Sequence, residues 1–268
     1  MNSAALAAEL LAAYDAARCI VPPASRAEGL TMPQAFEVGR EIHRLRLQRG
    51  ERQLGWKIGF TNRSIWPRYG VYAPIWGPVW DSTTAQLDGT QAELSLAGLS
   101  QPRLEPEVVF GFASAPRAGL SLEELQGCLA WVAHGFEVVH THCDGWRFAA
   151  SDCMADFALH GRLRVGPRVP VAGWPTLAQD LAALRVELHG DGVLKDQGQG
   201  SIVLDGPLHA LKTWIDAMAE HTPWWQVQPG DVVTTGTLTD AWPLVPGQRW
   251  HTVLSDPRLP GLQLTTVA

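Results

Sequence analysis

The chain has 268 residues, a formal net charge of −6 and 46% hydrophobic residues, which is enough to bury a large core. It contains no block of Lys and Arg of the kind that binds a phosphate backbone, so nucleic acid is not an expected partner. No apolar run reaches the roughly 18 residues that cross a bilayer, and the apolar N-terminal segment carries Glu9 and Asp15, so we expect neither a membrane span nor a signal peptide. The four cysteines form no C-x-x-C pair, which favours reduced thiols and a cytoplasmic protein.

The first 50 residues predict two helices. Ser3 is a plausible N-cap for the first, in which Leu6 and Leu10 recur at helical spacing. The second begins at TMPQAF, where Thr31 and Gln34 have the spacing of a capping box.

After residue 50, short apolar runs separated by Gly and Pro predict β-strands. The runs are GWKIGFT (55–61), EPEVVFGF (105–112), RVELHG (185–190), SIVLDG (201–206) and PGDVVTTGTLT (229–239). Two more helices are expected over SLEELQGCLAWVAH (121–134) and PLHALKTWIDAMAE (207–220). The pattern predicts an α+β fold with an N-terminal region of helices and strand over 1–80 and a β-rich domain over 81–268, together forming one compact unit.

Three carboxylates stand in unusual places. Glu105 and Glu107 alternate along a predicted strand and therefore share a face, with Pro106 on the other. One explanation is an edge strand with its polar face in water, which tolerates a proline; another is a cation between the two carboxylates. Glu137 lies in the apolar segment WVAHGFEVVH, where an ionised carboxylate must be paired or bound to a metal. Together the three suit a hard divalent cation, Mg²⁺ or Mn²⁺.

Lys57 is a lone cation in the apolar strand GWKIGF. Its stem can pack while its ammonium reaches water, which is the common arrangement for a lysine in a strand. Beside a carboxylate and metal cluster it would instead be a candidate acid or base.

The sequence offers weaker candidates as well. His140–Asp144 (HTHCD) gathers soft metal ligands, but their spacing is not that of a structural zinc site. Asp156 stands four residues after Asp152 on an expected helix capped by Ser151, among apolar neighbours. The run TTGTLT (234–239) is either a polar turn or a carboxylate-binding loop.

Several of these motifs occur in the order seen in a known family. They are GWKIGFTN, RLEPEVVFGF, GFEVVHTH, SDCMADFALHG, GQGSIVLDGPLHALKTW and PGDVVTTGTLT. From about residue 50 onward the chain resembles the 2-keto-4-pentenoate hydratase and 4-oxalocrotonate decarboxylase group of the fumarylacetoacetate hydrolase superfamily. The resemblance implies a mixed β-sandwich or roll behind a helical N-terminal part, a homo-oligomer, and possible association with a partner enzyme of the same pathway in aromatic catabolism.

The resemblance also implies roles for individual residues. Glu105, Glu107 and Glu137 look like the family's Mg²⁺ or Mn²⁺ ligands, and Lys57 and Asp81 look like its catalytic residues. The substrate-binding positions implied in the same way are Asp156, His160, Thr235, Gly236 and Thr237.

The reaction implied is that of a lyase acting on a small 2-oxo or 2-hydroxydienoic acid, through an enolate that the cation stabilises. Hydration is the main expectation. Decarboxylation of a 4-oxalocrotonate-type acid is the first alternative, and hydrolysis of a carbon–carbon bond in an acylpyruvate or a catalytically silent partner subunit are the others.

The chain departs from the family's usual A-D-N-A-S-S-G pattern at ADFALHG (155–161), where Phe157, Leu159 and His160 replace Asn and the two Ser residues. The aromatic loop 66–80 is a second peculiarity. We therefore expect His160 and this loop to influence the choice of substrate.

Overall fold

The computed structural model describes residues 2–268. Its helices are α1 Ser3–Asp15, α2 Met32–Gln48, α3 Trp66–Tyr69, α4 Leu122–Gly127, α5 Ala150–Ala155, α6 Leu177–Ala183 and α7 Pro207–His221. The strands of the larger sheet are β1 Gln53–Gly59, β2 Ile75–Trp80, β3 Thr84–Gln86, β5 Arg103–Phe112, β6 Leu129–Val139, β7 His160–Val165, β8 Val169–Pro170, β11 Val232–Thr237 and β12 Trp242–Pro243. Those of the smaller sheet are β4 Gln91–Ser95, β9 Arg185–Gly190, β10 Val193–Gln199, β13 Arg249–Leu254 and β14 Gln263–Val267.

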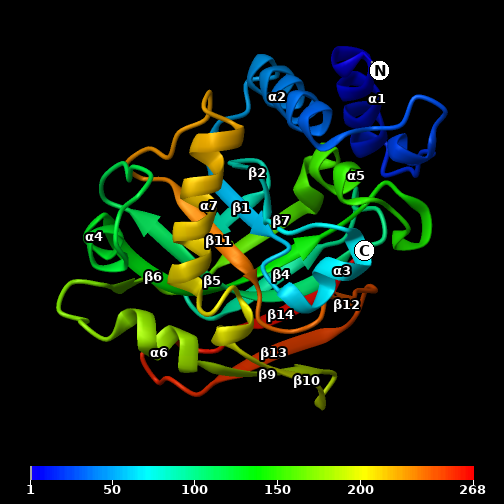
Figure 1. Cartoon of the computed structure of the whole chain (residues 1–268). Helices are drawn as coiled ribbons and strands as arrows, with labels where there is room; N and C mark the ends of the chain where they lie inside the picture. The colour runs from blue at the N-terminus through cyan, green and yellow to red at the C-terminus, as the bar shows by residue number, and fades with distance from the viewer. Residues whose placement is uncertain (1) are drawn as a thin grey trace.

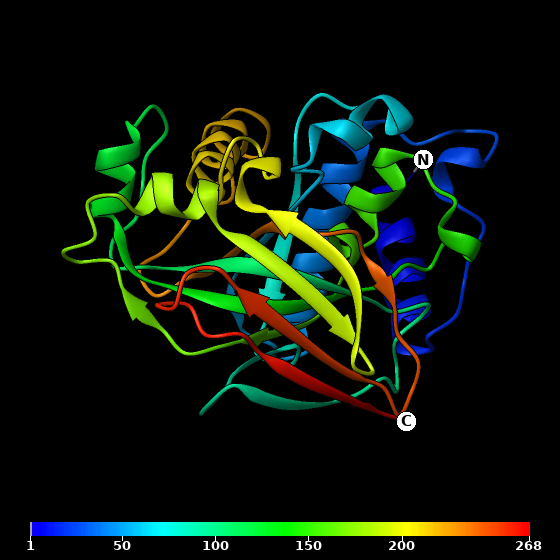
Figure 2. The same cartoon turned by 90° about the horizontal axis from the view of Figure 1, so that it is seen from below.

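Two sheets form the body of the protein. The main path of the larger sheet runs β2-β1-β11-β5-β6-β7-β3, and the smaller sheet runs β10-β9-β13-β14-β4 (Figures 1 and 2). Leu104 and Phe136 of the larger sheet pack against Leu188 and Trp250 of the smaller one. This arrangement confirms the expected α+β fold with a β-rich body.

Helix α7 packs against this same face of the larger sheet, over β1 and β11. Trp56 of β1 contacts Trp214 of α7, with ring centroids 6.0 Å apart, and α7 crosses the sheet beside β11 (Figure 1). Because successive side chains of a strand point to opposite faces, Lys57 points away from α7. By the same alternation, the odd-numbered residues of β5 point to the face of the sheet away from the one that Leu104 occupies.

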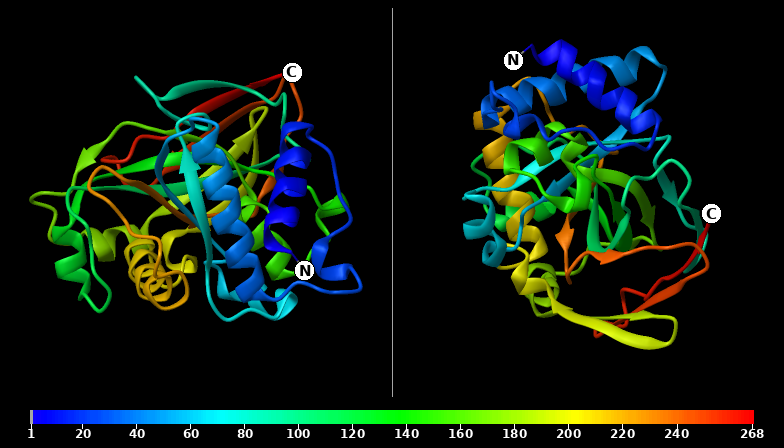
Figure 3. Two further views of the ribbon diagram at one scale, coloured as in Figure 1. Left: turned by 90° about the horizontal axis from the view of Figure 1, so that it is seen from above. Right: turned by 90° about the vertical axis from the view of Figure 1, so that its right-hand side faces the viewer.

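The N-terminal helices lie side by side at one end of the body (Figure 3). Thr31 and Gln34 form the expected capping box of α2. Helix α1 begins one residue earlier than expected, because the side chain of Asn2, and not that of Ser3, accepts hydrogen bonds from the Ala4 and Ala5 amides. The larger sheet includes β1 and β2, so it extends across the expected boundary at residue 80.

Two local predictions were wrong. The helix expected over 121–134 ends at Gly127, and the chain then forms β6, which pairs with β5 from Phe112↔Leu129 to Arg103↔Val139. This long pairing overrides the local helical signal. The segment expected as a strand over 201–206 instead continues a short 3-10 helix, Gly200–Ile202, into a turn in which Leu204 and Asp205 have φ of 48° and 73°.

The edge-strand explanation for Pro106 is also wrong, because β5 lies between β11 and β6 inside the larger sheet. Within residues 2–268, no helix is both long and apolar enough to cross a membrane.

Candidate metal site and its cavity

Strand register brings the three glutamates together. Glu105 pairs directly with Glu137 across β5 and β6, and Glu107 follows on the same face of β5. One carboxylate oxygen from each lies within 4.8 Å of the other two. In the described part of the chain, this is the only group of three or more His, Cys, Asp or Glu side chains with such spacing, so the HTHCD segment forms no comparable cluster.

The carboxylates are in a setting that penalises negative charge. Glu107 and Glu137 are fully buried, and burial together with the neighbouring carboxylates raises the pKa of Glu107 well above its ordinary value. Burial likewise raises the pKa of Glu105 to about 7, against the opposing effect of Lys57. For Glu137, burial is outweighed by Lys57 and by the hydrogen bond from His160, so its pKa is lowered.

The free oxygens of this cluster fit a hard cation. Glu107 uses Oε2 to accept a hydrogen bond from the Gly236 amide at 2.8 Å, whereas its Oε1 has no hydrogen-bond partner among residues 2–268. Glu137 uses Oε1 for His160, and its Oε2 makes no hydrogen bond there, although the Lys57 ammonium lies 3.4 Å away. Buried carboxylate oxygens without donors are costly unless a cation binds them, and Mg²⁺ and Mn²⁺ prefer such ligands.

Lys57 lies beside this cluster. Its side chain is only 3% exposed, so the interpretation in which its ammonium reaches water was wrong. The ammonium donates a hydrogen bond to the Ala158 carbonyl at 3.0 Å and lies 3.4 Å from Glu137 Oε2. Burial disfavours its charge, but the attraction of the three glutamates is larger and raises the pKa of Lys57 above its ordinary value.

The carbonyl that orients Lys57 belongs to a strained turn. Phe157, Ala158 and Leu159 are consecutive buried residues with φ of 56°, 49° and 65°. Non-glycine residues in this left-handed region are uncommon, and each costs on the order of 1–3 kcal/mol. Neither Phe nor Leu signals such a turn, so the sequence did not predict it.

A cavity of about 300 Å³ opens above the cluster. Lys57 and Glu105 line it, as do Ala158 and Leu159 of the strained turn and Gly236 and Thr237 at the end of β11. The aromatic loop contributes Tyr69, whose ring stacks on Phe148 with centroids 5.6 Å apart. Arg68 of the same loop also lines it, and three further lining residues were not among the predicted site residues: Arg103, Trp146 and Phe148.

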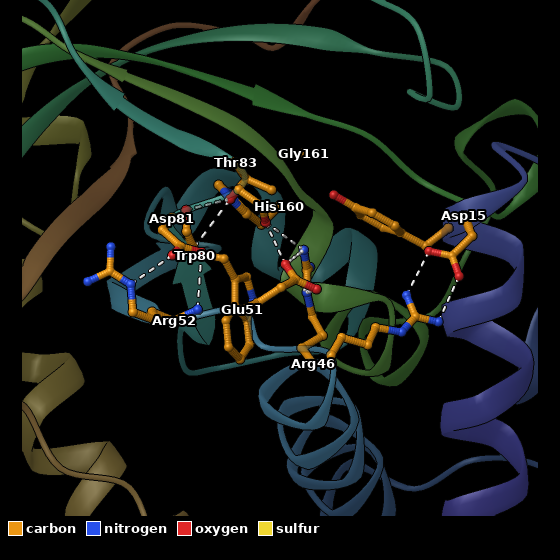
Figure 4. A network of polar contacts seen from close by, with 12 residues as sticks. Asp15, Arg46, Glu51, Arg52, Trp80, Asp81, Thr83, His160 and Gly161 are labelled. Carbon is orange, nitrogen blue, oxygen red and sulfur yellow. Dashed lines mark hydrogen bonds and ion pairs between the residues drawn. The ribbon is translucent and has the colours of Figure 1, made fainter.

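His160 lies behind the cluster and does not line the cavity. Its Nδ1 is 2.8 Å from Glu137 Oε1. Its Nε2 is 2.8 Å from Thr83 Oγ1 (Figure 4). The imidazole therefore connects a carboxylate of the cluster to the segment after β2.

Asp81 is also outside the cavity. Its carboxylate accepts hydrogen bonds from the Arg52 backbone amide at 3.1 Å and from Arg52 Nε at 3.0 Å (Figure 4). The structure thus does not bring Asp81 to Lys57 and the glutamates, and its catalytic role stays a prediction from resemblance.

Asp156 is buried and fully engaged in local hydrogen bonds. It accepts from Thr141 Oγ1, from the His142 amide and from His142 Nδ1. The expected cap at Ser151 is wrong, because α5 begins at Ala150 and Asp152, near the helix start, accepts from the Ala149 amide.

The β11 turn reaches the cavity in part. Gly236 and Thr237 line it, and Gly236 has φ of 100°, a conformation that glycine adopts without strain. The Thr235 hydroxyl instead donates to the Val108 carbonyl within the sheet.

Comparison with known proteins identifies the family. No protein-family model matches the chain. The chain is 30% identical to 2-keto-4-pentenoate hydratase of Burkholderia vietnamiensis over 239 residues, covering 88% of this chain and 87% of that protein. It is 28% identical to 2-hydroxyhexa-2,4-dienoate hydratase of Comamonas testosteroni over 96% of this chain and 95% of that protein.

The fold agrees with these relatives. The structure matches 4-oxalocrotonate decarboxylase of Pseudomonas putida G7, solved with magnesium and adipate, at a TM-score of 0.89 and 22% identity over 99% of this chain and 97% of that one. Fumarylpyruvate hydrolase of Pseudomonas aeruginosa matches at a TM-score of 0.60 over 81% and 89%. The chain therefore belongs to the 2-keto-4-pentenoate hydratase and 4-oxalocrotonate decarboxylase family, with a fumarylacetoacetate hydrolase-like fold.

Proposed function

We propose that this protein is a divalent-metal-dependent lyase that hydrates a small 2-hydroxydienoic or 2-oxo acid in aromatic catabolism. The observation that carries the proposal is the buried cluster of Glu105, Glu107 and Glu137, with free oxygens, beside Lys57 at the floor of a cavity. The names of the two hydratases that span most of the chain support it. We further propose that the protein works in the cytoplasm, as its unpaired cysteines suggest, and as a homo-oligomer, as the family resemblance implies.

Each residue has a distinct task in this proposal. Glu105, Glu107 and Glu137 hold the cation, which when bound would act as a Lewis acid toward the carboxylate and 2-oxo group of the substrate. Lys57, with its raised pKa, is protonated and donates or returns a proton on the substrate carbon chain. Tyr69 and Phe148 exclude bulk water from one side of the cavity.

Magnesium and manganese are the proposed cations. Structural neighbours were solved with magnesium and with Mn²⁺, and the all-oxygen cluster suits either ion.

Decarboxylation is the second candidate. The high structural similarity to a 4-oxalocrotonate decarboxylase favours it, and both reactions begin with the same charge on the 2-oxo oxygen. The products separate them: hydration of a 2-hydroxydienoate yields a 4-hydroxy-2-oxo acid, whereas decarboxylation releases CO₂.

Solvent exchange tests the chemistry common to both. With Mg²⁺ or Mn²⁺, the protein should exchange the C3 protons of 2-oxobutanoate for deuterium in D₂O, followed by proton NMR. EDTA or Glu107→Gln should abolish the exchange, whereas Glu220→Gln on the exposed end of α7 should leave it intact. A folded, metal-loaded protein with no exchange above buffer would refute the lyase and favour the silent partner subunit.

A further inference from the structure

Two arginines line the cavity without an ion pair to a carboxylate of the described residues. Arg103 of β5 and Arg68 of α3 both line it, and within residues 2–268 neither side chain forms an ion pair or a hydrogen bond with another side chain. Arg26 and Arg49, in contrast, each make a two-bond contact with a carboxylate. A guanidinium offers five donors in a planar fork that matches a carboxylate, so an unpaired one at a ligand cavity is a recognition group.

Arg103 is held in place by an aromatic side chain. Its guanidinium carbon lies 4.2 Å from the centre of the Trp146 ring, and Trp146 Nε1 donates to the Gln101 carbonyl at 3.1 Å. Stacking on the ring leaves the in-plane N–H groups free to bind an anion. Arg68 stacks on Tyr69 in the same manner, with its guanidinium carbon 5.4 Å from the ring centre.

The spacing along β5 relates Arg103 to the glutamate cluster. Arg103 precedes Glu105 by two residues, so both share one face, and their Cα atoms are about 7 Å apart along the strand. A short extended acid that lies along β5 with its 2-oxo end at the cluster therefore directs its far end toward Arg103.

The charges of the cavity favour an anionic group at that far end. A divalent cation and Lys57 together balance the three glutamates. What remains on the wall is Arg68 and Arg103 against one carboxylate, Asp240, which is exposed and pairs with neither. The outer part of the cavity thus keeps a net positive charge, which attracts an anion.

We propose that Arg103 and Arg68 form a subsite for a second carboxylate, so that the preferred ligand is a 2-oxo dicarboxylic acid. This inference rests on the proposed function, because it places the 2-oxo end of the ligand at the glutamate cluster. It deepens that function by naming the substrate class, since the curated relatives include hydratases named for acids with one carboxylate and for acids with two.

A matched pair of ligands tests the subsite. We would measure the binding of 2-oxohexanedioate and 2-oxohexanoate by calorimetry in the presence of Mg²⁺, because the two acids differ only in the distal carboxylate. The wild-type protein should bind the dicarboxylate at least about tenfold more tightly, as expected for a charged hydrogen bond of about 1.4 kcal/mol. Arg103→Gln should lower this ratio about tenfold, and Arg103→Lys should lower it less because the charge remains.

Two further variants serve as controls for misfolding and for nonspecific effects of charge. Arg68 is an exposed residue of α3. Arg68→Gln should therefore lower the ratio of the two affinities without affecting thermal stability. Arg117→Gln removes an arginine that is 75% exposed and does not line the cavity, so it should leave the ratio unchanged.

The outcomes separate the two proposals. Equal affinity of the wild-type protein for the two acids, or a ratio that survives Arg103→Gln and Arg68→Gln, would overturn the subsite while leaving the lyase intact. A strong preference for the dicarboxylate without metal-dependent C3 exchange of either acid would support the subsite and refute the lyase. Failure of both acids to bind would refute both.

Discussion

Replacement of His160 distinguishes positioning of a metal ligand from recognition of substrate. His160 is 1% exposed, and its two ring nitrogens contact Glu137 Oε1 and Thr83 Oγ1, both at 2.8 Å. His160→Phe keeps a ring of similar size but removes both hydrogen bonds. Thr83 Oγ1 still donates to the Trp80 carbonyl, so the main loss falls on the Glu137 carboxylate.

The size of the effect follows from that loss. Partners that orient a metal-binding carboxylate typically contribute 10–100-fold to metal affinity, which is about 1.4–2.7 kcal/mol. We therefore expect His160→Phe to bind Mg²⁺ or Mn²⁺ about 10–100-fold more weakly. The rise in melting temperature caused by the metal should shrink accordingly, because ligand stabilisation depends on the ratio of ligand concentration to Kd.

Calorimetric titration with Mn²⁺, alongside melting curves with and without metal, would measure this. His160→Gln should recover part of the affinity, since an amide can donate to Glu137, and His251→Ala on the smaller sheet is the control. The sequence led us to expect that His160 selects the substrate. Unchanged metal affinity combined with altered relative rates among 2-oxo acids would restore that role and refute the positioning role.

Three other expectations follow from the structure. Lys57→Met should fold normally, yet lower turnover roughly 10²–10⁴-fold, as for loss of an acid–base group, whereas Lys195→Met on the exposed β10 should not. Burial lowers the pKa of His134 to about 4 from an ordinary value near 6.5, so the unfolded chain takes up the proton first as the pH falls. Stability should therefore drop by on the order of 3 kcal/mol between pH 7 and pH 4, and urea denaturation should show less of this drop in His134→Gln. Burial raises the pKa of the Cys143 thiol to about 12, so iodoacetamide followed by mass spectrometry should label exposed Cys19 in the folded protein and Cys143 only after unfolding. Rapid labelling of Cys143 in the native state would contradict this.

The glutamate cluster was predictable because each member broke a local rule. Glu105 and Glu107 alternate in an apolar strand, and Glu137 has only apolar neighbours, so a shared cation was a direct physical explanation. The register that joins them was not predictable, because α4 separates β5 from β6 and conceals their pairing.

Lys57 illustrates a different limit. Its strand lies parallel to β11, and Lys57 pairs with Thr234, a residue 177 positions later in the chain. The local sequence carries no signal of such a distant pairing. It therefore could not decide whether the ammonium of Lys57 is buried or exposed. Arg103 was visible in the same stretch as Glu105, but its significance depends on a cavity whose other walls come from distant segments.

The strained turn at Phe157–Leu159 links the N-terminal helices to the proposed chemistry. Strain persists only where the surroundings impose it, and here the Phe157 ring packs on Tyr14 of α1 with centroids 4.7 Å apart. This conformation points the Ala158 carbonyl toward the Lys57 ammonium. Tyr14→Leu should therefore lower turnover while leaving Mn²⁺ affinity unchanged, because the glutamates do not contact Tyr14. Trp224→Leu, at an exposed aromatic side chain that does not line the cavity, is the matched control. Equal turnover in Tyr14→Leu and the wild-type protein would show that the turn holds its conformation without α1.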